Sequence, residues 1–373
     1  MTLPPFYQLD LARLAQNNRR RTLTLARGHD FSSNDYLALA GSPALRGAAR
    51  AALERGVALG SGGSRLLRGN GVEHEALEAR AAAFFGAPSA LFLGSGFAAN
   101  SLLFATLPQT EDLILYDDLV HASAHEGMRL SRAPSRAFVH NDVQSAADAI
   151  AGWRARGGRG TPWIAFETLY SMDGDRAPVA EFAELARREG AMLLADEAHA
   201  VGVFGPQGRG LAADLHGQEN AIVLATCGKA LGCEGALVLG PKIIREFLVN
   251  RGRGFIFSTA PSPLMAAVAQ AALDIVADAD DRRARLAGLV TGAGAAVARL
   301  GIAPSGSQIQ PVVIGEDART MEIAAALQAR GFDVRGVRPP TVPAGSARLR
   351  LSITLNSDAQ SIAALSEALE DLL

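Results

Sequence analysis

The chain has 373 residues, of which 49% are hydrophobic and 20% charged, a composition typical of a globular protein with two or three lobes. Its net charge of −2 and isoelectric point near 6.4 argue against nucleic acid or an anionic membrane as the main partner. Two cysteines, Cys227 and Cys233, with no histidine cluster nearby, support neither a disulfide framework nor a zinc site, and fit a reducing cytoplasm.

The first 40 residues are expected to form an arm (1–40) ahead of the first domain. The arginines of this arm follow its apolar residues and it has no long apolar core, so it does not resemble a signal peptide. A helix is expected over 43–56, followed by the glycine-rich loop "GSGGSRLLRGNG". The next segment predicts a helix that opens at a capping box of Asn70 and Glu73 and ends at Gly86.

Residues 86–109 are uncharged over a length that would span a bilayer. Glycine and polar residues interrupt this segment: Gly94, Ser95, Gly96, Asn100 and Ser101. The interruption favours a short buried strand, a tight turn and a helix, so no membrane span is expected.

Short apolar runs then alternate with segments of helical length. The runs are "ALFLG", "LILYD", "WIAFE", "AMLLAD" and "AIVLAT", and the helices are expected over 97–107, 121–131, 144–155 and 179–189. This alternation predicts an α/β domain over 41–275, with a mostly parallel sheet between helices. Ligands of such sheets bind beyond the carboxyl ends of the strands. Several polar or glycine residues follow the predicted strands there: Gly94 to Phe97, Asp117, Glu167, Asp196 and Thr226.

The remaining residues, 276–373, predict a smaller C-terminal α+β domain. It contains a helix rich in Ala and Arg, the strands "IQPVVIG", "DVRGV" and "ARLRLSIT", and a helix over 319–330. The last helix is expected to begin at a capping box of Ser357 and Gln360. Its predicted buried stripe is Ile362, Leu365, Leu369 and Leu372.

The motif "GSGFAAN" allows two interpretations. It matches G-x-G-x-x-A after a strand, and Asp117 follows Gly94 at about the spacing of a ribose-binding acid, as in a nicotinamide-dependent dehydrogenase. Against this, the turn lies well inside the chain, and no Tyr-x-x-x-Lys motif ends at Lys229 or Lys242. The same turn suits any phosphate bound at a helix N-terminus.

Asp196 and His199 lie in "LLADEAHAVGVFG", at the end of an apolar strand. They could be a turn cap and a surface histidine, or part of a metal pair, although no third ligand is in view. Alternatively, Asp196 faces a pyridine nitrogen and His199 lies near the phenolic oxygen of the same ring. A buried carboxylate would keep that nitrogen protonated, because opposite charges shift a pKa by about 1–3 units.

Lysine is rare in this chain: all but two of the 36 basic residues are arginine, and the exceptions are Lys229 and Lys242. A guanidinium keeps its proton, whereas an amine can lose it and attack a carbonyl carbon. Lys229, in "TCGKA", follows Asp196 near the end of the next strand, in a segment that is not a Walker A motif. Lysine for an aldehyde, aspartate for a pyridine nitrogen and a helix N-terminus for a phosphate together suit pyridoxal 5'-phosphate.

Nine segments resemble the α-oxoamine synthases, a family of fold-type I pyridoxal-phosphate enzymes. They are "FSSNDYLAL", "GSGGSRL", "SGFAAN", "HNDV", "SMDGDRAPV", "DEAHAVGVFGPQGRG", "TCGKALG", "FIFSTAPSP" and "RPPTVPAGSARLRLS". The last segment resembles the branch of that family that serves biotin biosynthesis. The resemblance covers almost the whole chain and implies a transferase with a mostly parallel seven-stranded sheet in its large domain.

The resemblance implies roles for side chains around the cofactor. Lys229 would bond to the aldehyde and later remove the substrate Cα proton, Asp196 would pair with the pyridine nitrogen, and His121 would stack on the ring and face the substrate. A lone histidine at this place could instead cap a helix. Further cofactor contacts are implied for Gly96, Phe97, Ser171, His199 and Thr226, and for Ser258 and Thr259, which would reach the cofactor phosphate across a homodimer with shared sites.

Substrate contacts are implied for three arginine or threonine positions. Arg350 resembles the arginine that binds the substrate carboxylate, for which a bidentate guanidinium suits better than an amine. Arg19 and Thr341 match positions that touch the acyl substrate.

These expectations describe a decarboxylating condensation of L-alanine with a pimeloyl thioester of coenzyme A or acyl-carrier protein. A sister synthase that uses glycine or serine, the dehydrogenase above and a non-catalytic binding subunit are the alternatives. Lys229, Asp196 and His121 argue against the last of these. No metal, nucleic acid or membrane is expected to take part.

Overall fold

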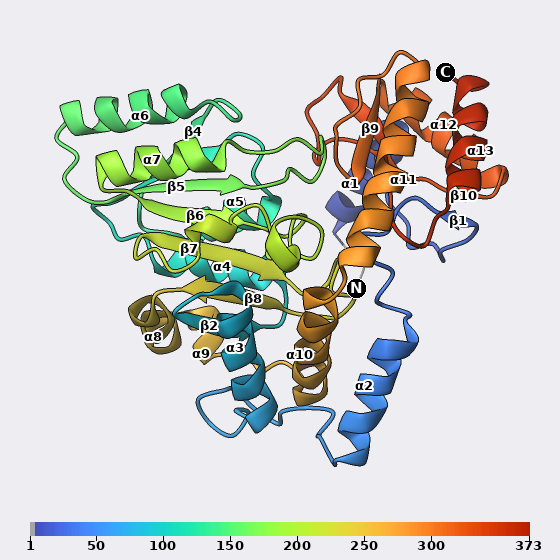
Figure 1. Ribbon diagram of the computed structural model, residues 1–373. Coiled ribbons are helices and arrows are strands. Elements are labelled where there is room, and N and C mark those ends of the chain that lie inside the picture. The colour runs from blue at the N-terminus through green and yellow to red at the C-terminus, as the bar shows by residue number, and fades with distance from the viewer. Residues whose placement is uncertain (1–3) are drawn as a thin grey trace. The chain divides into compact units, whose positions relative to one another are not determined.

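The computed structural model describes residues 4–373, which divide into two compact units (Figure 1). The large unit comprises Leu37–Ser171 and Arg176–Arg283. The small unit comprises the chain up to Tyr36, Met172–Asp175 and Ala284–Leu373. The sequence suggested domain boundaries at residues 40 and 275, whereas the boundaries between these units lie after Tyr36 and after Arg283. The N-terminal residues belong to the same unit as the C-terminal ones.

The large unit is built on a seven-stranded sheet with the strand order β2-β8-β7-β6-β5-β3-β4. Its strands are β2 (Ser89–Leu93), β3 (Leu113–Asp117), β4 (Ser135–Phe138), β5 (Pro162–Glu167), β6 (Met192–Asp196), β7 (Ala221–Thr226) and β8 (Ala236–Gly240). The strands from β4 to β7 are parallel, and β8 runs antiparallel to both β7 and β2. The mostly parallel seven-stranded sheet expected for this fold class is confirmed.

Both faces of this sheet are covered, because consecutive residues of β2, β5 and β7 are all buried. The helices of the large unit are α2 (Pro43–Glu54), α3 (Val72–Phe85), α4 (Gly96–Thr106), α5 (Ala122–Leu130), α6 (Val143–Ala155), α7 (Val179–Glu189), α8 (Lys242–Arg251), α9 (Arg253–Ile256) and α10 (Pro263–Ala277). Helix α4 packs against β7 and β8, whereas α7 packs against β5 and β6. Helices α4 and α5 also pack on each other and share one apolar core with the strands.

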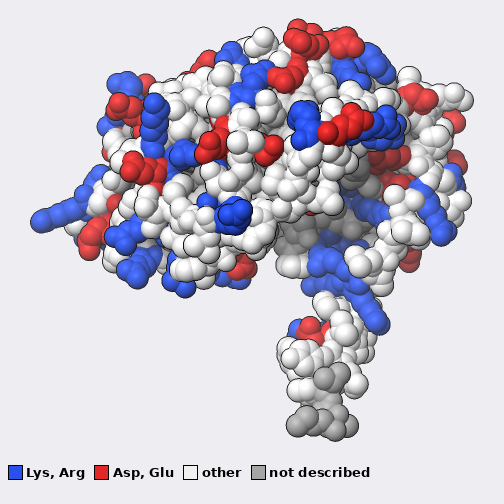
Figure 2. Space-filling view, turned by 90° about the horizontal axis from the view of Figure 1, so that it is seen from below, with Lys and Arg blue, Asp and Glu red and all other residues white. Residues whose placement is uncertain are grey.

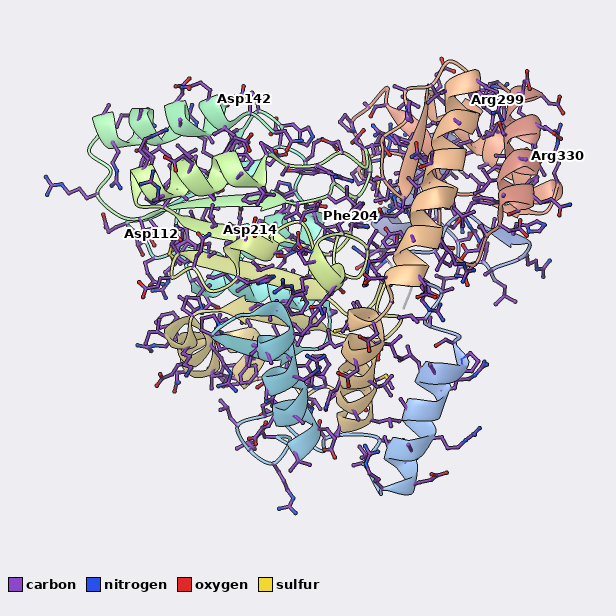
Figure 3. The ribbon with its side chains drawn as sticks, viewed as in Figure 1. Asp112, Asp142, Phe204, Asp214, Arg299 and Arg330 are labelled. Atoms are coloured by element: carbon purple, nitrogen blue, oxygen red, sulfur yellow. The ribbon has the colours of Figure 1, made fainter. Side chains whose placement is uncertain are left out.

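Several helix ends follow from local sequence. Asp142 begins α6, where its Oδ1 accepts the Ser145 amide at 2.9 Å (Figure 3). Gly86 ends α3 in a left-handed conformation with φ 73°, as predicted. The capping box predicted at Asn70 is wrong, because Gly71 precedes α3 and the Asn70 side chain instead contacts Arg65 and Glu75.

The small unit contains a three-stranded antiparallel sheet with the order β11-β12-β9, and a two-stranded parallel pair, β1 with β10. Its strands are β1 (His29–Asp30), β9 (Ile309–Gly315), β10 (Phe332–Asp333), β11 (Gly336–Val337) and β12 (Ala347–Ser352). Its helices are α1 (Pro5–Gln16), α11 (Asp280–Arg299, from Ala284 onward), α12 (Asp317–Ala329) and α13 (Ala359–Glu370). The β1–β10 pair ties the N-terminal segment to the C-terminal residues.

Two predictions for the small unit need correction. "DVRGV" is not one strand but the end of β10 and the whole of β11, separated by two residues. The last helix is capped by Asp358, whose Oδ1 accepts the Ser361 amide at 2.7 Å, and not by Ser357. The hydroxyl of Ser357 instead donates to the carbonyl oxygen of Asp30 at 2.7 Å.

The segment 86–109 forms β2, a turn and α4, as the interrupted apolar pattern predicted. Within residues 4–373, no helix combines the length and apolar character needed to cross a bilayer. The face shown in Figure 2 intersperses basic and acidic side chains, in keeping with a net charge near zero.

Candidate active site

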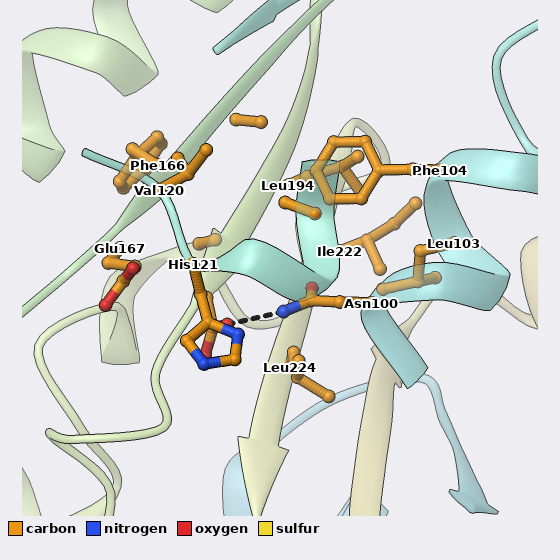
Figure 4. Close-up of a pocket in the computed structure, with 14 residues that line it drawn as sticks. Asn100, Leu103, Phe104, Val120, His121, Phe166, Glu167, Leu194, Ile222 and Leu224 are labelled. Atoms are coloured by element: carbon orange, nitrogen blue, oxygen red, sulfur yellow. Dashed lines mark hydrogen bonds between the residues drawn. The ribbon is translucent and has the colours of Figure 1, made fainter. Parts of the chain in front are cut away.

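The candidate site lies at the carboxyl ends of the parallel strands of the large unit. Asp117, Glu167, Asp196 and Thr226 are the last residues of β3, β5, β6 and β7, as predicted. Glu167 and Asp196 are register partners on adjacent strands. A pocket at this edge is lined by Asn100, His121, Glu167 and Asp196 together with apolar side chains of α4, β6 and β7 (Figure 4).

Asp196 is held at the end of β6 by two donors. Its Oδ1 accepts the backbone amide of Ala198 at 2.9 Å, and its Oδ2 accepts Nδ2 of Asn100 at 2.7 Å (Figure 4). Asn100 comes from α4 and is 5% exposed. Both carboxylate oxygens are therefore fixed in direction, as a counter-charge for a bound cationic ring requires.

Lys229 lies in a turn after β7 that brings the chain back to β8. The amide of Cys227 donates to Gly235 O at 2.8 Å, and the amide of Cys233 donates to Cys227 O at 2.9 Å. Inside this closed turn, Nζ of Lys229 lies 2.7 Å from Nε2 of His199. The amine thus has a nitrogen base within hydrogen-bonding distance, and the two residues predicted from separate motifs are brought together.

His121 is the N-cap of α5, and both interpretations of this residue can hold at once. Its Nδ1 accepts the Ser123 amide at 3.2 Å, which is a capping bond, while its ring meets the ring of Phe97 edge-on at 6.5 Å between centroids. Burial lowers the pKa of His121, Asp196 raises it and Lys229 lowers it. His121 and Asp196 also line the same pocket.

The N-terminus of α4 offers a place for a phosphate. Ser95 caps the helix by accepting the Ala98 amide at 3.1 Å, so the amides of Gly96 and Phe97 precede the first intrahelical bonds. A Cβ added to Gly96 would lie 3.6 Å from Oγ1 of Thr226, which puts the threonine hydroxyl beside the helix start. The predicted group of Gly96, Phe97 and Thr226 is thus one local cluster.

Glu167 is a residue that the sequence reasoning placed at a strand end without giving it a role. It is 3% exposed, its Oε2 accepts the Ser171 amide at 3.3 Å, and its Oε1 has no partner among the described residues. Burial raises the pKa of Glu167 well above its usual range, and the neighbouring Asp196 acts in the same direction. Burial thus favours the protonated form of Glu167 at this edge of the sheet.

Ser258 and Thr259 follow α9 and are both exposed. The next residue, Ala260, is tied to the glycine-rich loop, because its amide donates to Gly63 O at 2.8 Å and its carbonyl accepts Oγ of Ser61 at 2.7 Å. The two hydroxyl residues are thus presented by an anchored segment at the surface of the chain.

Arg350 lies on β12 of the small unit and is 8% exposed. Its Nη1 donates to Ser352 Oγ at 2.7 Å, and its Nη2 donates to Asn34 Oδ1 at 3.1 Å and to the Tyr36 hydroxyl at 3.4 Å. Burial raises the pKa of Tyr36, which keeps the phenol neutral. Three neutral oxygens therefore orient this guanidinium.

The other two predicted substrate residues also belong to the small unit. Nε of Arg19 lies 2.6 Å from Asp317 Oδ2, so this arginine is paired with a carboxylate at the start of α12. Thr341 is exposed and its Oγ1 accepts Nη2 of Arg21 at 3.2 Å.

The residues of the large unit fit pyridoxal phosphate. Asp196 supplies an oriented carboxylate, Lys229 an amine beside an imidazole, and the Gly96 end of α4 supplies free amides beside a hydroxyl. The dinucleotide interpretation fails at Asp117, which is fully buried and accepts hydrogen bonds from Leu119, His140 and Asn141 within the protein. Asp117 is therefore not available to bind a ribose.

Comparisons with known proteins agree with this geometry. A family model described as aminotransferase class I and II matches residues 27–369. The chain is 46% identical to the 8-amino-7-oxononanoate synthase of Anaeromyxobacter dehalogenans over 350 residues, or 92% of this chain and 87% of that protein.

Two solved structures have a similar fold. The serine palmitoyltransferase of Sphingomonas wittichii has a TM-score of 0.88 and 26% identity, covering 99% of this chain and 96% of that one. The 8-amino-7-oxononanoate synthase of Francisella tularensis has a TM-score of 0.77 and 26% identity, covering 92% and 97%.

Proposed function

Because the chain belongs to the aminotransferase class I and II family and is a pyridoxal-phosphate-dependent, acyl-transferring enzyme, we propose that it makes 8-amino-7-oxononanoate for biotin biosynthesis. The proposed reaction condenses L-alanine with a pimeloyl thioester of coenzyme A or acyl-carrier protein and releases carbon dioxide and the free carrier. The observation that carries the proposal is the meeting of Asp196, His121 and the Lys229–His199 pair at one sheet edge, in a chain 46% identical to a synthase of that name.

In this proposal each side chain around the cofactor has a separate role. Lys229 would hold the aldehyde of the cofactor covalently and, once alanine has displaced it, would accept the Cα proton at Nζ. The bound cofactor supplies an electron sink for the charge left on Cα. Asp196, whose Oδ2 is held by Asn100, would keep the proton on the pyridine nitrogen, and His121 would cover the ring.

Further residues would bind and orient the two substrates and the cofactor oxygens. Arg350 would take the alanine carboxylate through a bidentate pair. Ser171 and His199 would contact the ring substituents, while the phosphate would lie on Gly96, Phe97 and Thr226.

The remaining proposed contacts concern the acyl substrate and a second subunit. Arg19 and Thr341 would contact the acyl substrate. Ser258 and Thr259 would reach the phosphate in the partner subunit of a homodimer, which their exposure on an anchored segment permits. The free thiols of Cys227 and Cys233 suit the reducing cytoplasm as the proposed compartment.

The test is a titration of the cofactor-loaded protein with L-alanine, glycine and L-serine, followed by visible absorbance, and an assay of carbon dioxide release with pimeloyl-coenzyme A. Alanine should perturb the spectrum at the lowest concentration and support release of carbon dioxide. A preference for serine would point instead to a reaction like that of the structurally similar serine palmitoyltransferase, and a preference for glycine to another sister synthase.

A further inference from the structure

Four polar side chains form one hydrogen-bonded chain from Asp196 to His121. Nδ2 of Asn100 lies 2.7 Å from Asp196 Oδ2 and 3.0 Å from Ser123 Oγ, and Ser123 Oγ lies 2.7 Å from Nδ1 of His121. Figure 4 shows the Asn100 end of this chain, beside the His121 ring. Asn100 is 5% exposed and Ser123 is fully buried, so water does not compete for these bonds.

The directions of these bonds follow from what each group can donate. The amide Nδ2 of Asn100 has hydrogens only to give, so Ser123 Oγ accepts from it. The hydroxyl hydrogen of Ser123 is then directed to Nδ1 of His121, which also accepts the Ser123 backbone amide at 3.2 Å. A nitrogen that accepts from two donors holds no proton, and the imidazole proton is therefore on Nε2.

We propose that Asn100 and Ser123 are positioning residues that hold His121 neutral, with its proton on Nε2. A helix cap alone does not require this arrangement, because the backbone amide of Ser123 already satisfies that function. The hydroxyl of Ser123 adds a second donor to Nδ1 of His121. The side-chain amide of Asn100 links this hydroxyl to the carboxylate of Asp196.

The consequence rests on the proposed function, in which His121 covers a protonated pyridine ring. A charged imidazolium there would repel the ring and compete with it for Asp196, whereas a neutral imidazole does neither. The relay of Asn100 and Ser123 thus keeps His121 from competing with the cofactor for the carboxylate of Asp196.

Other charges act on His121 as well. Burial lowers its pKa, and Lys229 and His125 act in the same direction, while Asp196 opposes them. These charges act on the imidazole as a whole, whereas the relay of Asn100 and Ser123 opposes protonation at one atom, Nδ1. The tautomer therefore reports the relay and not the surrounding charges.

The experiment is a pH titration of the cofactor-loaded protein labelled with nitrogen-15 at its seven histidines, followed by NMR of the imidazole nitrogens. In the wild type, His121 should show an unprotonated Nδ1 and a protonated Nε2. Ser123→Ala and Asn100→Ala should each raise the pKa of His121 by about one unit, since a donor to Nδ1 is lost or set free to turn away. Ser123→Thr, which keeps the hydroxyl, should restore the wild-type tautomer.

Ser101→Ala is the matched control. The Ser101 hydroxyl contacts the carbonyl oxygen of Ser123 at 3.4 Å and so borders the same helix start without belonging to the relay. It should leave His121 unchanged, and the signals of His125, on the same helix, should stay constant in every variant.

A protonated Nδ1 in the wild type would overturn the proposal. So would an unchanged tautomer and pKa in Ser123→Ala, which decides the matter even if Asn100→Ala does not fold. Because the measurement needs no substrate, its outcome is independent of the alanine and pimeloyl-thioester assay. A failure of the proposed reaction and a failure of the relay are therefore distinguishable.

Discussion

The charged side chains at the sheet edge of the large unit and those on strand β12 of the small unit have different kinds of hydrogen-bond partners. At the sheet edge, polar side chains pair with one another. Nζ of Lys229 lies within hydrogen-bonding distance of Nε2 of His199, and Oδ2 of Asp196 accepts Nδ2 of Asn100. On β12, the guanidinium of Arg350 is oriented by neutral oxygens of Ser352 and other residues. The contacts at the sheet edge place an amine beside an imidazole and aim a carboxylate, whereas the oxygens around Arg350 fix the direction of a planar guanidinium.

Strand β12 contains its own contrast. Arg348 and Arg350 lie two residues apart and point to the same face of the strand. Nη1 of Arg348 is paired with the carboxylate of Asp173, while Arg350 contacts Ser352, Asn34 and Tyr36. The guanidinium of Arg348 is thus committed to an ion pair within the small unit, and Arg350 stays the predicted ligand of the substrate carboxylate.

The largest effect is expected at the sheet edge, from Lys229→Ala. Loss of both the covalent link and the base should reduce turnover about 10⁴-fold or more, as measured by carbon dioxide release. Lys242→Ala is the control, because Lys242 is the only other lysine of the sequence and follows β8, whose antiparallel direction puts its carboxyl end at the opposite edge of the sheet. Equal activity of the two variants would remove Lys229 from the mechanism.

Asp196→Asn should give the next largest effect. Without the carboxylate, the pKa of the pyridine nitrogen should fall by about 1–3 units, so that the nitrogen loses its proton more readily. The value of kcat should then fall about 10- to 1,000-fold. Glu167→Gln is the matched variant on the adjacent strand, where burial already raises the pKa well above its usual range. It should cost much less, and an equal loss in both variants would show that the two carboxyl groups do not differ as described.

The two arginines of β12 should separate substrate affinity from stability. Arg350→Ala should weaken L-alanine binding about 10- to 100-fold, the range of a charge-assisted pair, with little change in cofactor affinity. Arg348→Ala should lower the melting temperature, because it leaves the carboxylate of Asp173 without its partner, while alanine binding changes little. Spectroscopic titration and thermal unfolding measure the two quantities, and the reverse pattern would exchange the roles of the residues.

Much of the large unit was predictable because its information is local. Buried strands such as β5 and β7 are continuous apolar runs, and Asp196, Thr226 and Lys229 follow such runs directly. The edge strand β4 is largely exposed and shows no such run, and the antiparallel direction of β8 depends on a chain reversal that periodicity does not encode. Local patterns therefore located the site but not the whole sheet.

The contacts within the site were less predictable. Asn100 lies four residues after Gly96, one helical turn along the quoted motif, and this spacing is the only signal that could have pointed to it. Its partners Ser123 and Asp196 come from α5 and β6, so the relay exists only after α4 and α5 have packed on the sheet. The roles of Arg19, Thr341 and Arg350 came from the resemblance alone, and they stay predictions.

The last prediction concerns stability rather than activity and distinguishes two neighbouring carboxyl groups, Asp196 and Glu197. Glu197 is fully buried, and its Oε1 accepts the amides of Leu211 and Ala212 at 3.0 Å each, which fixes the loop after β6. Burial raises the pKa of Glu197 to about 8. The folded protein therefore holds a proton that the unfolded chain releases near pH 4.5, and this stabilisation is present below that pH and is lost as pH rises toward 8.

Glu197→Gln should remove this pH dependence while keeping an acceptor for both loop amides. Between pH 5 and pH 8, the free energy of unfolding of the variant should rise relative to the wild type by about 1.4 kcal/mol per pH unit, measured by urea denaturation. A difference that stays constant with pH would mean that Glu197 is ionised in the folded protein. Glu197 would then carry a buried charge, and its description as a neutral carboxyl group that fixes the loop after β6 would fail.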